Sequence, residues 1–161
     1  KEVMQKIDKP FDYQHALKSV KKMNKVKIFT QACFVIGYPG EKKIDLIKTI
    51  KMIFDLSKRG IDEIAVFIIT PIPGSNIYEQ FKGFSSLSNL TFTPTWRSDY
   101  KQLYKERLIM YLIFLSTKLI FHPLKMLRQV INFFRKRFDT KMEMVPYKVL
   151  KLKSFENAKK T

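Results

Sequence analysis

The stretch Phe34-Val35-Ile36-Gly37-Tyr38-Pro39-Gly40-Glu41 carries an apolar segment directly into a turn rich in glycine and proline. Residues 28–36, which include the start of this stretch, are mostly apolar, with several β-branched and aromatic side chains. That composition predicts a strand covered on both faces, as in a parallel sheet. Because Cys33 lies within this run, we expect its thiol to be buried as a small apolar group rather than to act as a ligand or nucleophile.

A helix and a second strand follow the turn. Residues 41–59 place apolar side chains at helical spacing and lysines on the other side, and Gly60 is suited to end the helix. The face predicted to be buried contains Leu46, Ile47, Ile50, Ile53 and Phe54, and it can extend to Ser57. Residues 64–70 are again apolar. Strand, helix and strand joined by short connections predict a βαβ unit in an α/β fold with parallel strands.

Short segments on either side of this unit have recognisable signals. Asp12 is a suitable N-cap for a helix that ends near Asn24, and Ser75 can cap a short helix after the second strand. Residues 83–94 are rich in serine, threonine and asparagine, which predicts an irregular loop.

The last third of the chain is apolar, basic and helix-forming. Residues 103–117 and 124–138 predict two helices, separated by His122-Pro123. We therefore divide the chain into residues 1–82, a linker at residues 83–99, and a basic, apolar helical region at residues 100–161.

Two turn sequences carry a resemblance to a known family. Gly37 to Glu41 reads Gly-Tyr-Pro-Gly-Glu, and Thr70 to Gly74, one βα unit later, reads Thr-Pro-Ile-Pro-Gly. Together with the strands before them, they resemble the later part of the barrel of radical S-adenosylmethionine (SAM) enzymes, in particular the branch whose members often carry a cobalamin-binding domain. The resemblance covers residues 1–82. It implies the C-terminal part of a partial (β/α) TIM-like barrel, followed here by a basic α-helical tail.

The resemblance also implies that the carboxyl ends of both strands bind a cofactor, as such ends do in parallel α/β proteins. Val35 would make an apolar contact with the adenine of SAM, Gly37 would allow close backbone approach, and Glu41 would mainly support the turn. Backbone at the end of the second strand would meet the adenine as well. The predicted cofactor-binding residues are Val35, Gly37, Tyr38, Pro39, Gly40, Glu41, Ile69, Thr70 and Pro71.

The iron-sulfur motif of the family, Cys-x-x-x-Cys-x-x-Cys, is absent from these 161 residues, which contain one cysteine. We therefore predict no catalytic residue and no metal ligand here, and we expect that the chain alone does not cleave SAM. Because the sequence begins with Lys1 rather than Met, we expect a missing N-terminal portion of the same protein to hold the [4Fe–4S] cluster. A cobalamin-binding domain would precede the barrel.

The full-length protein is accordingly expected to be an enzyme. In the family, the cluster reduces SAM by one electron and yields a 5′-deoxyadenosyl radical. The outcome that we expect is cobalamin-dependent methyl transfer or cyclisation on an apolar small molecule. Two alternatives stay open: a radical SAM enzyme that modifies tRNA, and a non-enzymatic basic module that binds membrane or nucleic acid.

The chain is strongly basic, with a formal net charge of +17 and a pI near 9.9, and anionic surfaces are its natural partners. Residues 103–138 include an amphipathic helix suited to peripheral contact with an anionic membrane. The same face can instead pack on the barrel or on the missing N-terminal portion, which is the simpler explanation, and nucleic acid is a weaker alternative. The apolar run 108–115 is ended by Lys118 and is too short to span a bilayer. A single cysteine favours a reducing, cytoplasmic compartment.

Overall fold

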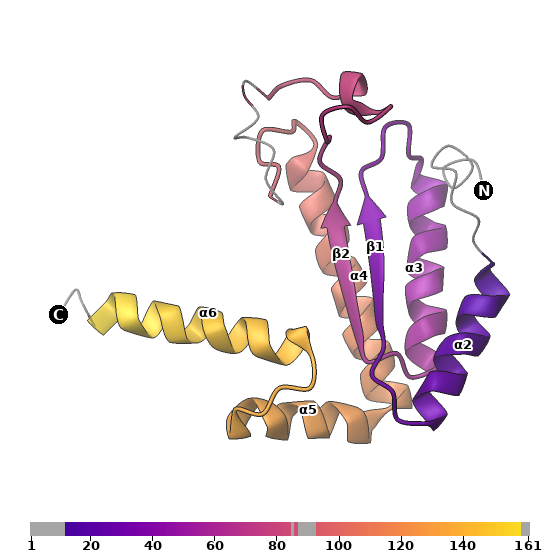
Figure 1. Cartoon of the computed structure of the whole chain (residues 1–161), viewed down its shortest axis with the longest axis vertical. Coiled ribbons are helices and arrows are strands. Elements are labelled where there is room, and N and C mark those ends of the chain that lie inside the picture. Colours follow the sequence, from indigo (N-terminus) through magenta and orange to yellow (C-terminus); the bar gives the residue numbers. More distant parts are fainter. Residues whose placement is uncertain (1–11, 85, 87–92, 159–161) are drawn as a thin grey trace.

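The computed structural model describes residues 12–84, 86 and 93–158, which form a mixed α/β arrangement around a two-stranded parallel sheet (Figure 1). Strands β1 (Gln31–Ile36) and β2 (Glu63–Ile68) are joined by helix α3 (Lys43–Lys58), which confirms the predicted βαβ unit and the α/β class. The described residues contribute two strands to this sheet, and the TIM-like barrel stays a prediction.

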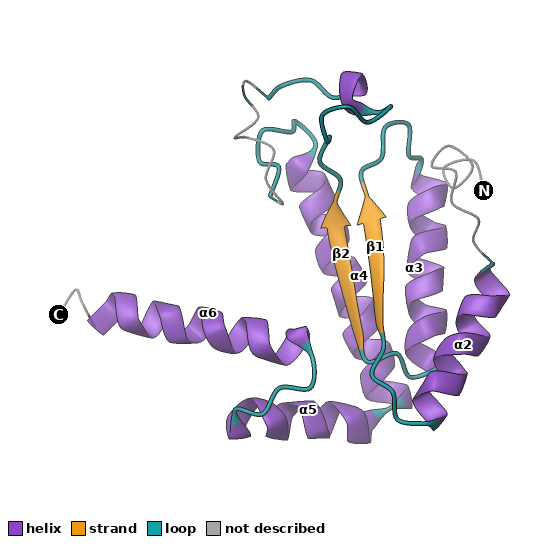
Figure 2. Ribbon diagram, viewed as in Figure 1, coloured by secondary structure: helices purple, strands orange, loops and turns teal. Residues whose placement is uncertain are grey.

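The remaining elements are helical (Figure 2). They are α2 (Tyr13–Lys25), a single 3₁₀ turn (Tyr78–Gln80), α4 (Tyr100–Phe121), α5 (Pro123–Arg135) and α6 (Lys141–Ala158). Asp12 caps α2 as predicted, because its Oδ1 accepts hydrogen bonds from the N–H groups of Gln14 and His15 at 2.8 and 3.0 Å. Ser75 caps nothing: its buried Oγ has no hydrogen-bond partner among the described residues.

Strand β1 begins three residues later than the apolar run predicts. The backbone of Thr30 is tied to the start of β2, since its N–H donates to Asp62 Oδ2 at 3.0 Å and its carbonyl accepts from Glu63 N at 3.1 Å. Because β2 starts only at Glu63, the residues before Gln31 have no partner strand. Ile28 and Phe29 consequently remain exposed outside the sheet.

One face of the sheet is covered by helices and the other is open. The covered face carries Phe34, Ile36, Ile64, Val66 and Ile68, which are buried. The open face carries two side-by-side pairs, Cys33 with Ala65 and Val35 with Phe67. Only one face is covered because α3 and α4 both pack against it, so the prediction of a strand buried on both faces is wrong for the described residues.

Cys33 is exposed on this open face, and the prediction that it is buried is wrong as well. We therefore expect the native chain to react with one equivalent of a thiol reagent without denaturant. If a longer protein covers the open face with further strands, the same cysteine should be protected there. Labelling of the 161-residue chain only after denaturation would contradict the open face.

Most of the predicted face of α3 is confirmed. Ile53 and Ser57 are buried, and Leu46 and Ile50 pack against the core. The predicted face differs at its margins, because Ile47 and Phe54 are exposed and Leu56 is buried instead. The hydroxyl of Ser57 is satisfied inside the helix, donating to the carbonyl of Ile53 at 2.6 Å, so burying this polar side chain costs little.

Helix α4 belongs to the same core as the sheet, where it passes behind β2 in Figure 1. Leu103, Met110 and Phe114 of α4 are buried with the apolar side chains of β1, β2 and α3. Part of the region predicted to be a helical tail is therefore the layer that covers the sheet.

The two helices predicted on either side of His122-Pro123 are confirmed as α4 and α5, with Pro123 in the first turn of α5. Helix α6 lies within the region 100–161 that was predicted to be helical, although no separate helix was delimited there. The irregular loop predicted at residues 83–94 falls largely on residues 85 and 87–92, which lie outside the described residues, as do residues 1–11. The domain boundaries stay predictions.

Candidate functional site

The two turns singled out in the sequence lie side by side at the carboxyl ends of the strands. We call residues 37–41 and 69–71 the strand-end site. The pairing extends one residue past β2, because the N–H of Ile69 donates to the carbonyl of Ile36, the last residue of β1, at 2.9 Å. The site therefore begins on two adjacent, hydrogen-bonded backbones at one edge of the sheet (Figure 1).

Glu41 holds the first turn together. Its Oε2 accepts a hydrogen bond from the N–H of Gly37 at 2.6 Å, and its own N–H donates to the carbonyl of Tyr38 at 2.9 Å. Burial raises the pKa of the Glu41 carboxyl, while the bonds from the backbone of Gly37 and Tyr38 oppose that rise. These contacts agree with the expected role of Glu41 as a support for the turn.

Gly37 is required by the packing of α4. Its φ is +80°, a conformation that favours glycine. A Cβ at this position would lie 2.8 Å from Leu103 Cδ1 and 3.2 Å from the nearest guanidinium nitrogen of Arg97. On the side where a Cβ would point, the atoms that come close to the backbone of Gly37 are therefore those of protein side chains.

Arg97 joins the two halves of the strand-end site. Its guanidinium donates to the carbonyl of Ile69 and to the carbonyl of Gly37, each at 3.1 Å, and it forms two further bonds to Asp99 at 2.8 and 2.7 Å. The hydrogen bonds from Arg97 hold the pKa of Asp99 below its usual value. Sequence reasoning missed this residue, because it stands in an irregular segment with no periodicity and its partners are far away in the chain.

An aromatic cluster packs beside Arg97. The guanidinium carbon lies 5.0 Å from the ring centroid of Phe81, and Trp96 makes edge contacts with Phe81 and Phe84 at centroid distances of 6.3 and 5.4 Å. Phe84 in turn contacts Tyr78 at 5.5 Å. These rings fix the segment after β2 against the strand-end site.

The remaining predicted site residues differ in exposure. Val35 lies on the open face of the sheet next to Phe67, and Gly40 is exposed. Partly buried positions are Tyr38, Pro39, Ile69 and Thr70, and Pro71 is buried. The structure thus brings an exposed apolar surface, Val35 with Phe67, next to two strand ends whose carbonyls are held by Arg97.

This arrangement fits an adenine better than it fits an iron-sulfur cluster. A flat apolar ring can rest on the exposed side chains of Val35 and Phe67, beside the carboxyl end of β2. A cluster needs several thiolate ligands, and the described part of the chain holds one cysteine and no group of three or more His, Cys, Asp or Glu side chains suited to a metal. Cluster chemistry therefore does not fit these residues.

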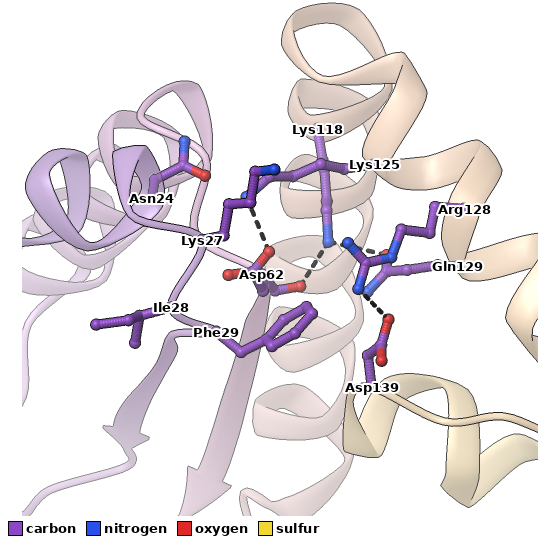
Figure 3. Close-up of a pocket in the computed structure, with 10 residues that line it drawn as sticks. All are labelled: Asn24, Lys27, Ile28, Phe29, Asp62, Lys118, Lys125, Arg128, Gln129 and Asp139. Atoms are coloured by element: carbon purple, nitrogen blue, oxygen red, sulfur yellow. Dashed lines mark hydrogen bonds and ion pairs between the residues drawn. The ribbon is translucent and has the colours of Figure 1, made fainter.

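An open cavity of about 170 Å³ lies at the opposite, amino end of the strands (Figure 3). Lys118 of α4 is buried beside it, with 0% of the residue exposed, and its Nζ donates to the carbonyl of Asp62 and to Gln129 Oε1 at 2.5 and 2.8 Å. Lys125 pairs with Asp62 Oδ1 at 2.9 Å, and Arg128 pairs with Asp139 at 2.5 Å. These charged contacts join α4, α5 and the start of β2.

Burial lowers the pKa of Lys118 from 10.5 to about 8, with Lys125 acting in the same direction and Asp62, Glu143 and Glu63 opposing it. Between pH 8 and 10.5 the Lys118 amine stays protonated in the unfolded chain and is deprotonated in the folded chain. The contribution of Lys118 to the free energy of unfolding therefore rises with pH across that window, by about 3 kcal/mol in total. Below pH 8 this contribution does not change with pH.

The measurement is denaturant unfolding at several pH values, comparing the native chain with Lys118→Met. We expect the difference between the two to change across this window. Parallel pH profiles would contradict the burial of a charged amine at this position.

Comparison with known proteins gives a distant similarity. No family model matches this chain. The chain is similar to an uncharacterized methyltransferase of Pyrococcus horikoshii, with 30% identity over 95 residues, or 59% of this chain. The match spans 19% of that protein, so the matched part of this chain corresponds to about a fifth of its relative's length.

Proposed function

We propose that this chain forms the SAM-binding edge of a methyl-transferring enzyme of the radical SAM type, whose remaining barrel lies in a longer protein. The observation that carries the proposal is the strand-end site: two adjacent parallel strands end in the two family-like turns, next to an open apolar surface. The similarity to an uncharacterized methyltransferase supports the methyl-transfer part.

In this proposal the chain binds and orients the adenine of SAM. Val35 offers it an exposed apolar contact, and residues 69–71 lie at the adjacent end of β2, where the resemblance places the second contact. Arg97 holds both strand ends at a fixed separation, because it donates hydrogen bonds to the carbonyls of Gly37 and Ile69. The strand-end site is therefore preorganised before SAM binds.

When bound, SAM supplies a methyl group or a 5′-deoxyadenosyl group to the reaction. The cluster and any cobalamin would be held by residues outside this chain. Further strands of a barrel would pair with the free edges of β1 and β2, and the open face would then line the barrel interior. An apolar small molecule is the proposed substrate, because the exposed side chains next to the strand-end site, Val35 and Phe67, are apolar.

The test is an anaerobic assay of the gene product that includes the coding sequence upstream of Lys1. After reconstitution with iron and sulfide, incubation with SAM and a reductant should release 5′-deoxyadenosine, methionine or S-adenosylhomocysteine. The upstream sequence should contain Cys-x-x-x-Cys-x-x-Cys. If S-adenosylhomocysteine forms although the motif is absent, the proposed methyl transfer stands and the radical mechanism is refuted. If no product derived from SAM forms, both parts of the proposal are refuted.

A further inference from the structure

Helix α5 is turned with its polar face toward the rest of the protein. Lys125 Nζ donates to the carbonyl of Gly60 at 2.7 Å as well as to Asp62, and Gln129 accepts from Lys118. Asn132 donates to Asp139 at 2.7 Å. A helix on the surface of a globular protein ordinarily buries its apolar face, so this orientation is inverted.

The apolar face of α5 is consequently exposed. Leu124 and Phe134 keep 79% and 76% of their surface accessible, and the side chains between them on the same face are exposed too. Together with the last turn of α4 they form what we call the α4–α5 apolar patch: Leu119, Ile120, Leu124, Leu127, Val130, Ile131 and Phe134.

The structure also corrects the prediction that Lys118 ends the apolar run of α4. Lys118 is the one charged residue between 108 and 121, and it is buried, bonded to Asp62 and Gln129. Its charge is therefore withdrawn from the outer surface, and the apolar residues Leu119 and Ile120 continue into Leu124 across the bend at Pro123.

Exposed basic residues lie on α5 and directly after its end, next to the patch. Arg128 and Arg135 are exposed on α5, Lys136 and Arg137 follow its end, and Lys58 of α3 lies 5.1 Å from the Phe121 ring centroid. An exposed apolar stripe bordered by cations matches the interface of an anionic bilayer, where side chains enter the acyl boundary and cations meet the headgroups.

We propose that the α4–α5 apolar patch docks peripherally on anionic lipid, with α5 lying in the plane of the interface. Within the described residues no single helix is long and apolar enough to cross a membrane; α4 and α5 meet that requirement only together, and the chain bends by 113° between them. The bend suits a helix that lies on a surface. Pairing of two copies through this patch would bring two clusters of like charge together, which disfavours a dimer.

The position of α5 also favours lipid over the rest of a barrel. Helix α5 lies beyond the amino ends of the strands, whereas further strands of a barrel would pair with the free backbone edges of β1 and β2 (Figure 1). The patch and the strand-end site are therefore at opposite ends of the sheet, and docking does not depend on the proposed function.

Flotation of the full 161-residue chain with vesicles tests this proposal. Vesicles of phosphatidylglycerol and phosphatidylcholine should carry the chain at low salt, and high salt or pure phosphatidylcholine should reduce the bound fraction. Ile120→Glu should lower partitioning at least tenfold, and Phe134→Glu should do the same. The matched control is Ile72→Glu, since Ile72 is 71% exposed against 72% for Ile120 but follows the carboxyl end of β2.

Circular dichroism of each variant shows whether it remains folded. No flotation of the native chain at either salt would overturn the proposal, and so would an equal loss in Ile72→Glu. If size-exclusion chromatography shows a dimer that Phe134→Glu dissociates, in a chain that does not float, the patch is a self-association surface instead. If the longer gene product fails to float although the 161-residue chain floats, the rest of that protein covers the patch, and the lipid assignment is wrong.

Discussion

Replacing Phe114 by alanine should lower the free energy of unfolding by about 3–5 kcal/mol, because a fully buried ring is removed from the point where α4 meets the sheet. The loss combines the transfer free energy of the ring with the cavity left behind. The measurement is denaturant unfolding followed by circular dichroism. A loss of this size is expected only if α4 is part of the core rather than a separate tail.

Leu112→Ala on the same helix is the matched control. Leu112 is exposed, so its truncation should change the free energy of unfolding by no more than about 0.5 kcal/mol. Equal, small effects of both substitutions would mean that α4 does not pack on β2 and α3 as described.

Arg97→Ala should have the second large effect, about 3 kcal/mol, because the side chain is buried and bonds two backbone carbonyls of different strands. Removing it leaves the carbonyls of Gly37 and Ile69 without a charged donor. Arg97→Lys should fail to restore most of this stability, since one ammonium group lacks the planar set of donors that reaches both carbonyls and Asp99.

Trp96, the single tryptophan, is a local reporter for the Arg97 experiment because it packs in the adjoining aromatic cluster. Its fluorescence should change in Arg97→Ala before denaturant is added. Arg135→Ala, at an exposed position of α5, is the control and should be nearly neutral. An Arg97→Ala protein with native stability and fluorescence would refute the bridging role.

Periodicity and turn residues were sufficient to predict the βαβ unit, the cap at Asp12 and the break at Pro123, because each depends on local backbone preferences. The same signals cannot show which face of an element has a partner. Cys33 was expected to be buried because its strand is apolar throughout, yet among the described residues helices cover only the other face.

Long-range contacts account for the residues that the sequence reading missed. Arg97 is 60 residues from Gly37 in the chain, and its role depends on both strand ends meeting. Lys118 was expected to interrupt an apolar surface, but contacts with Asp62 and Gln129 draw it inward. Helix α6 contains Pro146, which local preference disfavours inside a helix.

The central claim is that the strand-end site binds SAM, and SAM binding by the longer gene product tests it most directly. Val35→Asp places a charge on the proposed adenine surface, whereas Val26→Asp changes a valine of similar exposure, 66% against 53%, at the end of α2. Isothermal titration calorimetry should show SAM binding weakened at least tenfold by Val35→Asp and unchanged by Val26→Asp. Native affinity in a folded Val35→Asp protein would contradict the account.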